Sequence, residues 1–228
     1  TVPFGGFGMM GHFLNGDGGF GGMMGGEMMV NVNNPFYIAP KPLSIDEART
    51  VLNTYLTSLN DPNLKVVDIM IFDNHAYAQI VEKDSSIGVL EVLVDPTTKA
   101  VYPEMGPAMM WNQKYGMMSG YGRYGMMGGM MGGYFNGQNN NFNFDNSNTP
   151  PQITITPEQA VEMAQTYVDT NFAAANITVD EHVTPFYGYY TLHVQQDGQT
   201  VGMLGVNGYT GAVWPHTWHG KFLEVSME

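Results

Sequence analysis

Residues 44–48 read SIDEA and residues 156–160 read TPEQA. Each stretch starts with a hydroxyl residue, Ser44 or Thr156, and has Glu47 or Gln159 three positions later. The Ser44 hydroxyl can accept from the backbone three residues on, and the Glu47 side chain can accept in return, which forms a capping box. Thr156 is the expected cap of the second helix, with Glu158 in its first turn. We therefore expect helices at 44–59 and 157–171, with the second opening on Pro157 as its first residue.

A run of short strands follows each expected helix. The alternation of apolar and polar residues, broken by turn residues, predicts strands at 64–72, 75–83, 87–94 and 100–102 in the first half. The same signals predict strands at 177–184, 187–195, 200–206 and 212–214 in the second half. Each half therefore reads as one helix followed by an antiparallel meander.

The two halves match without a gap at one constant offset, the one that places Ser44 on Thr156. We call this the repeat offset. It also pairs residues further along the unit: Tyr55 with Tyr167, Tyr77 with Tyr189, Tyr102 with Trp214 and Pro103 with Pro215. The predicted fold class is α+β, with two repeated units that each pack one helix on an antiparallel meander. A unit of this size buries little apolar surface, so we expect the two units to pack together.

The capped helices and the ending VNGYTGAV at 206–213 resemble the PepSY domain family. The first half departs from the pattern once, with Lys99 where the second half has Gly211. The resemblance implies a secreted or membrane-attached protein, because the family occurs in protease propeptides, where it is thought to inhibit, and in small exported proteins. The chain also resembles short exported members of this family that carry Met/Gly/Tyr-rich tracts.

Composition excludes several function classes. Lys and Arg number 8 against 21 Asp and Glu, for a net charge of −13, so cations are too few to bind a run of nucleic-acid phosphates. No stretch approaches the roughly 18 apolar residues of a membrane-spanning helix. Cysteine is absent, which rules out disulfides, thiolate metal sites and iron–sulfur clusters.

Glycine and methionine are concentrated in two segments that lack the period of a helix or strand. Seven Met-Met pairs hold 14 of the 19 methionines, and all lie in these segments. We divide the chain into a Gly/Met-rich N-terminal arm (1–35), a first unit (36–103), a Met/Gly/Tyr-rich and then Asn-rich linker (104–151) and a second unit (152–228).

Histidine and methionine supply the candidate metal ligands. His216 and His219, three residues apart between Trp214 and Gly220, could hold one ion together, or lie on an exposed loop. Methionine thioethers suit soft ions such as Cu(I), although methionine also fills apolar interfaces. The candidate thioether sites comprise Met9 and Met10 with His12, and a second group of Met126, Met127, Met130 and Met131. The other histidines, His75, His182 and His193, are scattered and expected to be structural.

No catalytic motif is present, and we predict a protein that is not an enzyme. The low charge and the aromatic residues among glycines favour an exported structural protein that self-assembles into a homo-oligomer or homopolymer, such as a fibre or matrix. One alternative is an exported soft-metal protein that binds copper through its Met pairs and His216/His219. A second is a PepSY-type protease inhibitor or partner-binding module. Because the sequence opens at Thr1, as a processed chain would, we expect a secreted, extracellular or periplasmic location.

Deletion of residues 1–30 tests the self-assembly hypothesis. It removes Phe4, Phe7, Phe13, Phe20 and six methionines. If the arm forms contacts between subunits, the shortened chain stays folded by circular dichroism but no longer sediments as large particles, since burial of apolar surface contributes about 25 cal/mol per Å². Measured in a chelator, assembly by the shortened chain would contradict the hypothesis.

Overall fold

The computed structural model describes residues 40–116, 152–172 and 176–226. The Gly/Met-rich arm and most of the linker lie outside these residues. In chain order, the described elements are α1 (Ile45–Leu59), β1 (Leu64–Phe72), β2 (Ala76–Glu82), β3 (Gly88–Val94), β4 (Val101–Pro103), α2 (Pro107–Met110), α4 (Pro157–Phe172), β5 (Ile177–Phe186), β6 (Tyr189–Gln196), β7 (Gln199–Asn207), β8 (Val213–Pro215) and β9 (Phe222–Ser226). Among the described residues, no helix has both the length and the apolar character needed to cross a membrane.

Both predicted helix starts are confirmed. The Ser44 hydroxyl accepts from the backbone N–H of Glu47 at 3.2 Å, and the Glu47 carboxylate accepts from the backbone N–H of Ser44 at 2.9 Å. Thr156 and Gln159 form the same reciprocal pair at 3.3 and 2.9 Å. Each helix then packs its apolar stripe on the sheet, burying Ala48 and Leu52 in α1 and Ala160, Ala164 and Val168 in α4.

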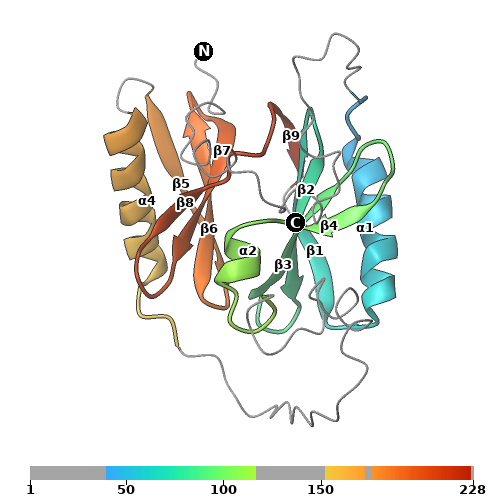
Figure 1. Ribbon diagram of the computed structural model, residues 1–228, viewed down its shortest axis with the longest axis horizontal. Coiled ribbons are helices and arrows are strands. Elements are labelled where there is room, and N and C mark those ends of the chain that lie inside the picture. Colours follow the sequence, from blue (N-terminus) through green and yellow to red (C-terminus); the bar gives the residue numbers. More distant parts are fainter. Residues whose placement is uncertain (1–39, 117–151, 173–175, 227–228) are drawn as a thin grey trace, which may run out of the picture.

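The predicted fold class is wrong in its architecture. Instead of two repeated helix-on-meander units, the nine strands form one large mixed sheet in the order β8-β7-β6-β5-β3-β2-β1-β9, with β4 paired to β3 (Figure 1). The two halves join where β3 and β5 run parallel and Gly88 pairs with Phe186. The sheet also continues past β1 because β9, from the end of the described chain, pairs antiparallel with it.

Burial on both faces explains why a separate unit was the wrong expectation. Every residue of β2 and β3 is buried, whereas one helix covers only one face of a sheet. Alternate residues of β2 contact the α1 side, and Tyr77 between them belongs to a different apolar cluster. The second face of each half therefore needs a cover, and the other half supplies it.

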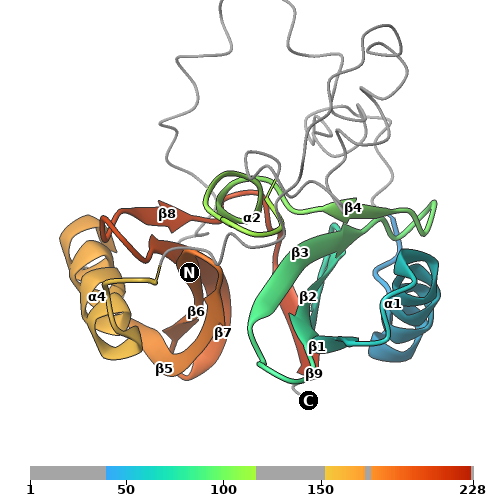
Figure 2. The same ribbon diagram turned by 90° about the horizontal axis from the view of Figure 1, so that it is seen from below.

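Helices α1 and α4 lie on opposite outer sides of the molecule, with the strands of both halves between them (Figure 2). The sheet faces that point away from the helices meet in a buried layer that we call the seam. Its large apolar and aromatic members are Met70, Phe72, Tyr77, Leu93, Phe186, Tyr189 and Met203.

The gapless repeat offset is also wrong for part of the sheet. Val94 and Val206 correspond by this offset. Val94 pairs with Ala76 and Val206 pairs with Tyr190, but Ala76 and Tyr190 do not correspond by the same offset. Tyr77 therefore corresponds by pairing to Thr191, not to Tyr189. The shift arises at the hairpins: β6 and β7 are joined by Asp197-Gly198, both with positive φ as in a two-residue turn, while residues 83–87 join β2 to β3.

The turn that carried the family resemblance has the same geometry in both halves. Asp95 Oδ1 accepts from the backbone of Thr98, and Asn207 Oδ1 accepts from the backbone of Thr210. Lys99 adopts φ 61° and Gly211 φ 71°. The departure at Lys99 therefore retains the left-handed conformation, which costs a non-glycine residue about 1–2 kcal/mol.

Two further segments complete the seam. Residues 104–116, which we call the strap, were assigned from sequence to the linker; here they pack on the body and include α2 and buried Glu104 and Asn112. β9 was not predicted, since the sequence analysis placed the last strand at 212–214. None of its five residues is fully buried, and two of them are exposed.

Gly88 is the position at which a small change tests the joining of the two halves. An added Cβ would overlap the ring of Phe186. We expect Gly88→Ala to lower the free energy of unfolding by about 1–3 kcal/mol, as overpacking does. Denaturant unfolding measures this, and Gly88→Ala combined with Phe186→Leu should lose less stability than the two single changes added together. Additive losses would contradict a contact between these residues.

Candidate metal centre

Three potential metal ligands converge in the seam, one from the strap and two from the loop between β8 and β9. Donor atoms of Glu104, His216 and His219 all lie within 4.8 Å of one another. Their side chains are 0%, 0% and 2% exposed. The sequence prediction that His216 and His219 act together is consistent with this placement.

The backbone places Glu104 and His216 by the same device. Glu104 follows β4, and its N–H donates to the carbonyl of Glu91 on β3 at 2.7 Å. His216 follows β8, and its N–H donates to the carbonyl of Met203 on β7 at 3.0 Å. Glu104 and His216 correspond by the repeat offset, and their acceptors, Glu91 and Met203, correspond as well. The two ligands therefore enter the seam from corresponding strands.

The donor atoms are close together but do not satisfy one another. Glu104 Oε1 lies 3.5 Å from His216 Nδ1 and 3.1 Å from His219 Nε2. Neither contact has hydrogen-bond geometry, and Glu104 Oε2, both His216 nitrogens and His219 Nε2 are buried without a hydrogen-bond partner. A buried polar atom without a partner costs about 1–3 kcal/mol, so a cluster of four is a costly arrangement for the polypeptide alone.

These distances suit a bound divalent ion. Bonds of about 2.1 Å at tetrahedral angles place neighbouring ligand atoms about 3.4 Å apart. Two imidazoles and one carboxylate form the set found in open Zn²⁺ sites and in the His₂-carboxylate sites of Fe²⁺. Imidazole and carboxylate favour divalent ions of this kind over Cu(I), which prefers sulfur.

Aromatic rings and a hydrogen bond fix the ligand side chains. The Trp218 indole N–H donates to Glu104 Oε1 at 2.9 Å, and its ring stacks on His216 at 4.9 Å between centroids. Phe72 stacks on His219 at 4.4 Å and 8°. On its other nitrogen, His219 Nδ1 lies 2.7 Å from His75 Nε2.

A second carboxylate, Glu91, lies in the same layer but is fully hydrogen-bonded. Its Oε1 accepts from Tyr77 at 2.6 Å and from Thr191 at 2.8 Å, and its Oε2 accepts from Tyr189 at 2.7 Å. Because these donors come from both halves, Glu91 bridges the seam.

Burial and neighbouring charge shift the pKa values of the cluster in different directions. Burial and then the Glu104 charge raise the pKa of Glu91 to about 7. Burial also opposes ionisation of Glu104, but the neighbouring imidazoles outweigh it and hold the Glu104 pKa below its usual value. Burial lowers the pKa of His219, whereas at His216 the Glu104 carboxylate overcomes burial and raises the pKa. At neutral pH the cluster therefore favours an ionised Glu104 and a neutral His219.

The structure places the remaining candidates elsewhere. Met9, Met10, His12, Met126, Met127, Met130 and Met131 lie outside the described residues. His182 is exposed on β5, and His193 is buried on β6 with its Nδ1 unpaired but does not belong to the cluster.

Sequence reasoning missed Glu104 and the role of His75. A signal for Glu104 existed: the repeat that pairs Pro103 with Pro215 pairs Glu104 with His216 one position later. No signal links His75 to His219, because their contact depends on how β9 and its preceding loop return to the first half.

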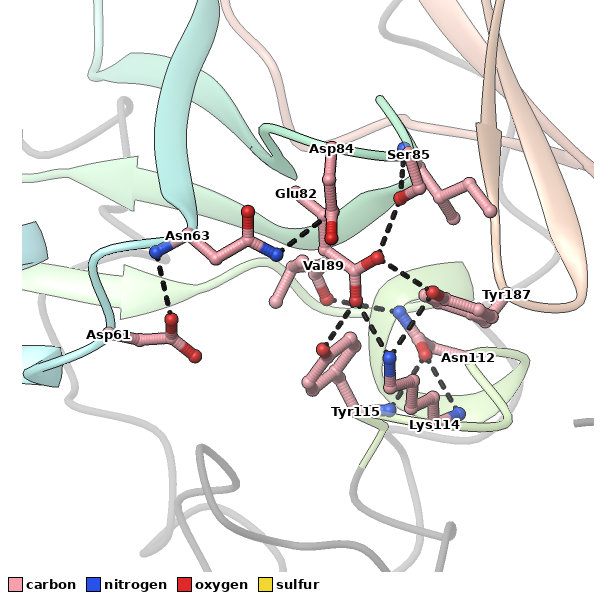
Figure 3. Close-up of polar contacts among 11 residues, drawn as sticks. Asp61, Asn63, Glu82, Asp84, Ser85, Val89, Asn112, Lys114, Tyr115 and Tyr187 are labelled. Atoms are coloured by element: carbon pink, nitrogen blue, oxygen red, sulfur yellow. Dashed lines mark hydrogen bonds and ion pairs between the residues drawn. The ribbon is translucent and has the colours of Figure 1, made fainter. Parts of the chain in front are cut away.

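A separate polar cluster joins the strap to both halves (Figure 3). Glu82, at the end of β2, accepts from Lys114 at 2.7 Å, from Tyr115 at 2.6 Å and from Tyr187 at 2.8 Å. Lys114 Nζ lies 4.6 Å from the centre of the Tyr187 ring. Asn112 donates to the carbonyl of Val89 at 3.0 Å. Both carboxylate oxygens of Glu82 accept hydrogen bonds, so we interpret this cluster as the contact that holds the strap.

The comparisons with known proteins give no family. No family model matches the chain, and no curated protein or solved structure matches it. The PepSY resemblance therefore stays a prediction.

Replacing Glu82 by Gln tests the strap contact. Burial would raise the pKa of Glu82, but the hydrogen bonds led by Lys114 outweigh it and lower the pKa to about 2. A lowered pKa stabilises the fold above the unfolded value of 4.5, and this stabilisation is lost as the pH falls towards 2. At pH 7 we expect Glu82→Gln to lower the free energy of unfolding by about 1–3 kcal/mol. The free energy of unfolding of this variant should also fall less steeply than that of wild type as the pH is lowered from 4.5 towards 2. Exposed Glu181→Gln is the control, and an equally steep fall in Glu82→Gln and wild type would contradict the prediction.

Proposed function

We propose that the protein binds one divalent transition-metal ion in the seam through Glu104, His216 and His219. The observation that carries the proposal is the convergence of three buried donor side chains, in which Glu104 Oε2, both His216 nitrogens and His219 Nε2 lack hydrogen-bond partners. Zn²⁺ and Fe²⁺ fit this donor set. The proposal develops the metal-binding alternative of the sequence analysis, with a borderline ion in place of Cu(I).

The position of the ligands supports a structural or storage role for the ion. Glu104 belongs to the strap that follows the first half, while His216 and His219 belong to the second half, between β8 and β9, so one ion would link both. A ligand that binds only the folded state stabilises it by RT ln(1 + [L]/Kd). The side chains are at most 2% exposed, which favours an enclosed ion over one that meets a substrate.

Self-assembly and protease inhibition remain separate predictions. Self-assembly rests on the Gly/Met-rich segments, most of which lie outside the described residues. Inhibition rests on the PepSY resemblance alone. Metal binding at the seam is compatible with either.

Metal uptake by the full chain tests the proposal. After dialysis against Zn²⁺ or Co²⁺ and removal of free ion, elemental analysis should give one ion per chain. Glu104→Gln and His216→Asn should each weaken binding at least tenfold, because each removes one of three ligands. Exposed His182→Asn should bind like wild type. Circular dichroism identifies any variant that has failed to fold, and Co²⁺ absorption in the folded variants then reports the ligand set.

Thermal unfolding adds a second readout in the same samples. At a free ion concentration of about 100 Kd the stabilisation is about 2.7 kcal/mol. For a chain of this length that corresponds to a rise in Tm of about 5–10 °C. The rise should shrink as the pH falls, because protons compete for His216, whose pKa is raised. An equal rise in Tm in wild type and in Glu104→Gln would overturn the proposal. A wild-type protein that takes up no ion would overturn it as well.

A further inference from the structure

His75 contacts a proposed ligand directly. It precedes β2, in the turn that joins β1 to β2, and its residue is 6% exposed. Its Nε2 lies 2.7 Å from Nδ1 of His219, the nitrogen that faces away from Glu104. The inference below rests on the proposed function, because it concerns how His219 would present its other nitrogen to the ion.

The two histidines belong to segments that are fastened together. The Asn74 side chain donates to the carbonyl of Trp218 at 3.0 Å and accepts from the backbone N–H of Gly220 at 2.9 Å. Asp73 Oδ1 accepts from the backbone N–H of Lys221 at 2.9 Å. An added Cβ on Gly220 would overlap Asp73 Oδ1, so a larger residue there would displace this carboxylate from its contact with the loop. The His75–His219 contact is therefore set by the backbone on both sides.

The rings around His219 also fix its plane. Phe72 stacks on one face, and the Tyr77 ring meets His219 edge-on at 5.4 Å between centroids. With the plane fixed, the orientation of the two nitrogens is fixed as well: Nδ1 faces His75 and Nε2 faces Glu104.

A neutral imidazole carries one hydrogen, on Nδ1 or on Nε2. To bind an ion through Nε2, His219 must carry its hydrogen on Nδ1, which then donates to His75 Nε2. His75 in turn carries its own hydrogen on Nδ1. The hydrogen bond between the rings thus couples their tautomers, and a partner that accepts at Nδ1 of His219 makes Nε2 the metal-binding atom.

We propose that His75 is a positioning residue of the metal centre, which selects Nε2 of His219 as the ligand atom by accepting a hydrogen bond from its Nδ1–H. It does not contact the ion. Loss of such an outer partner weakens metal binding about 10–100-fold in known metal sites.

Two substitutions at one position separate this role from packing. His75→Leu fills the space but cannot accept a hydrogen bond, while His75→Gln can place its amide oxygen near the position of Nε2. We expect His75→Leu to weaken Co²⁺ and Zn²⁺ binding by the full chain about 10–100-fold, and His75→Gln to restore most of the affinity. His193→Leu is the matched control, because His193 is also buried in the seam, at 3% exposure, but does not touch His219. It should bind like wild type.

Nitrogen-15 NMR of histidine-labelled wild type supplies a direct readout. With Zn²⁺ bound, His219 should show protonation at Nδ1 and His75 should show it at Nδ1 as well. This measurement needs no variant, so it decides the inference even if His75→Leu fails to fold.

Each outcome separates the inference from the proposed function. If wild type binds one ion and folded His75→Leu binds equally well, the positioning role is overturned and the metal centre stands. Equal weakening in folded His75→Leu and His75→Gln overturns it too, since an acceptor should rescue. Protonation of His219 at Nε2 in the loaded protein also overturns it. If wild type binds no ion, the proposed function and this inference both fall.

Discussion

The carboxylate of Glu91 is the contact on which the arrangement of the two halves depends. It accepts from Tyr77 on its own half of the sheet, and from Tyr189 and Thr191 across the seam, all within 2.8 Å. A carboxyl group buried in this layer would be costly without such partners. The hydroxyls that satisfy it must come from both sides, so the two sheet faces have one relative placement in which Glu91 is fully bonded. That placement also brings the strap and the loop after β8 together.

The metal centre lies at a point where corresponding positions of the two halves differ in chemistry. Glu104 and His216 hold the same backbone position beside β3 and β7, but one carries a carboxylate and the other an imidazole. Two identical residues there would place two like groups face to face. An acid opposite a base gives a pair that attracts, and His219 adds a third donor without adding charge when neutral. The sheet of this chain therefore provides a mixed nitrogen and oxygen ligand set from two related edges.

Local features of the fold could be predicted from the sequence, and long-range features could not. The capping box at Ser44, the helix cap at Thr156 and the predicted strands depend on neighbouring residues, and the structure confirms these elements. The single sheet depends on the pairing of Gly88 with Phe186, which no local pattern indicates. Likewise, His216 and His219 were found because they lie only three residues apart in the sequence. Glu104 and His75 join them through tertiary packing, and the shift in register at Asp197-Gly198 hid the true correspondence of Tyr77.

The pairing of β9 with β1 has a consequence for how the chain is made. Ile71 near the beginning of the described fold pairs with Glu224 near its end. A ribosome releases β1 long before β9, so the outer edge of β1 stays without its neighbour while most of the second half is synthesised. An exposed apolar strand edge can pair with another chain. Contacts so distant in sequence also slow folding. We therefore expect the outer edge of β1 to be open to pairing with other chains until β9 has been synthesised.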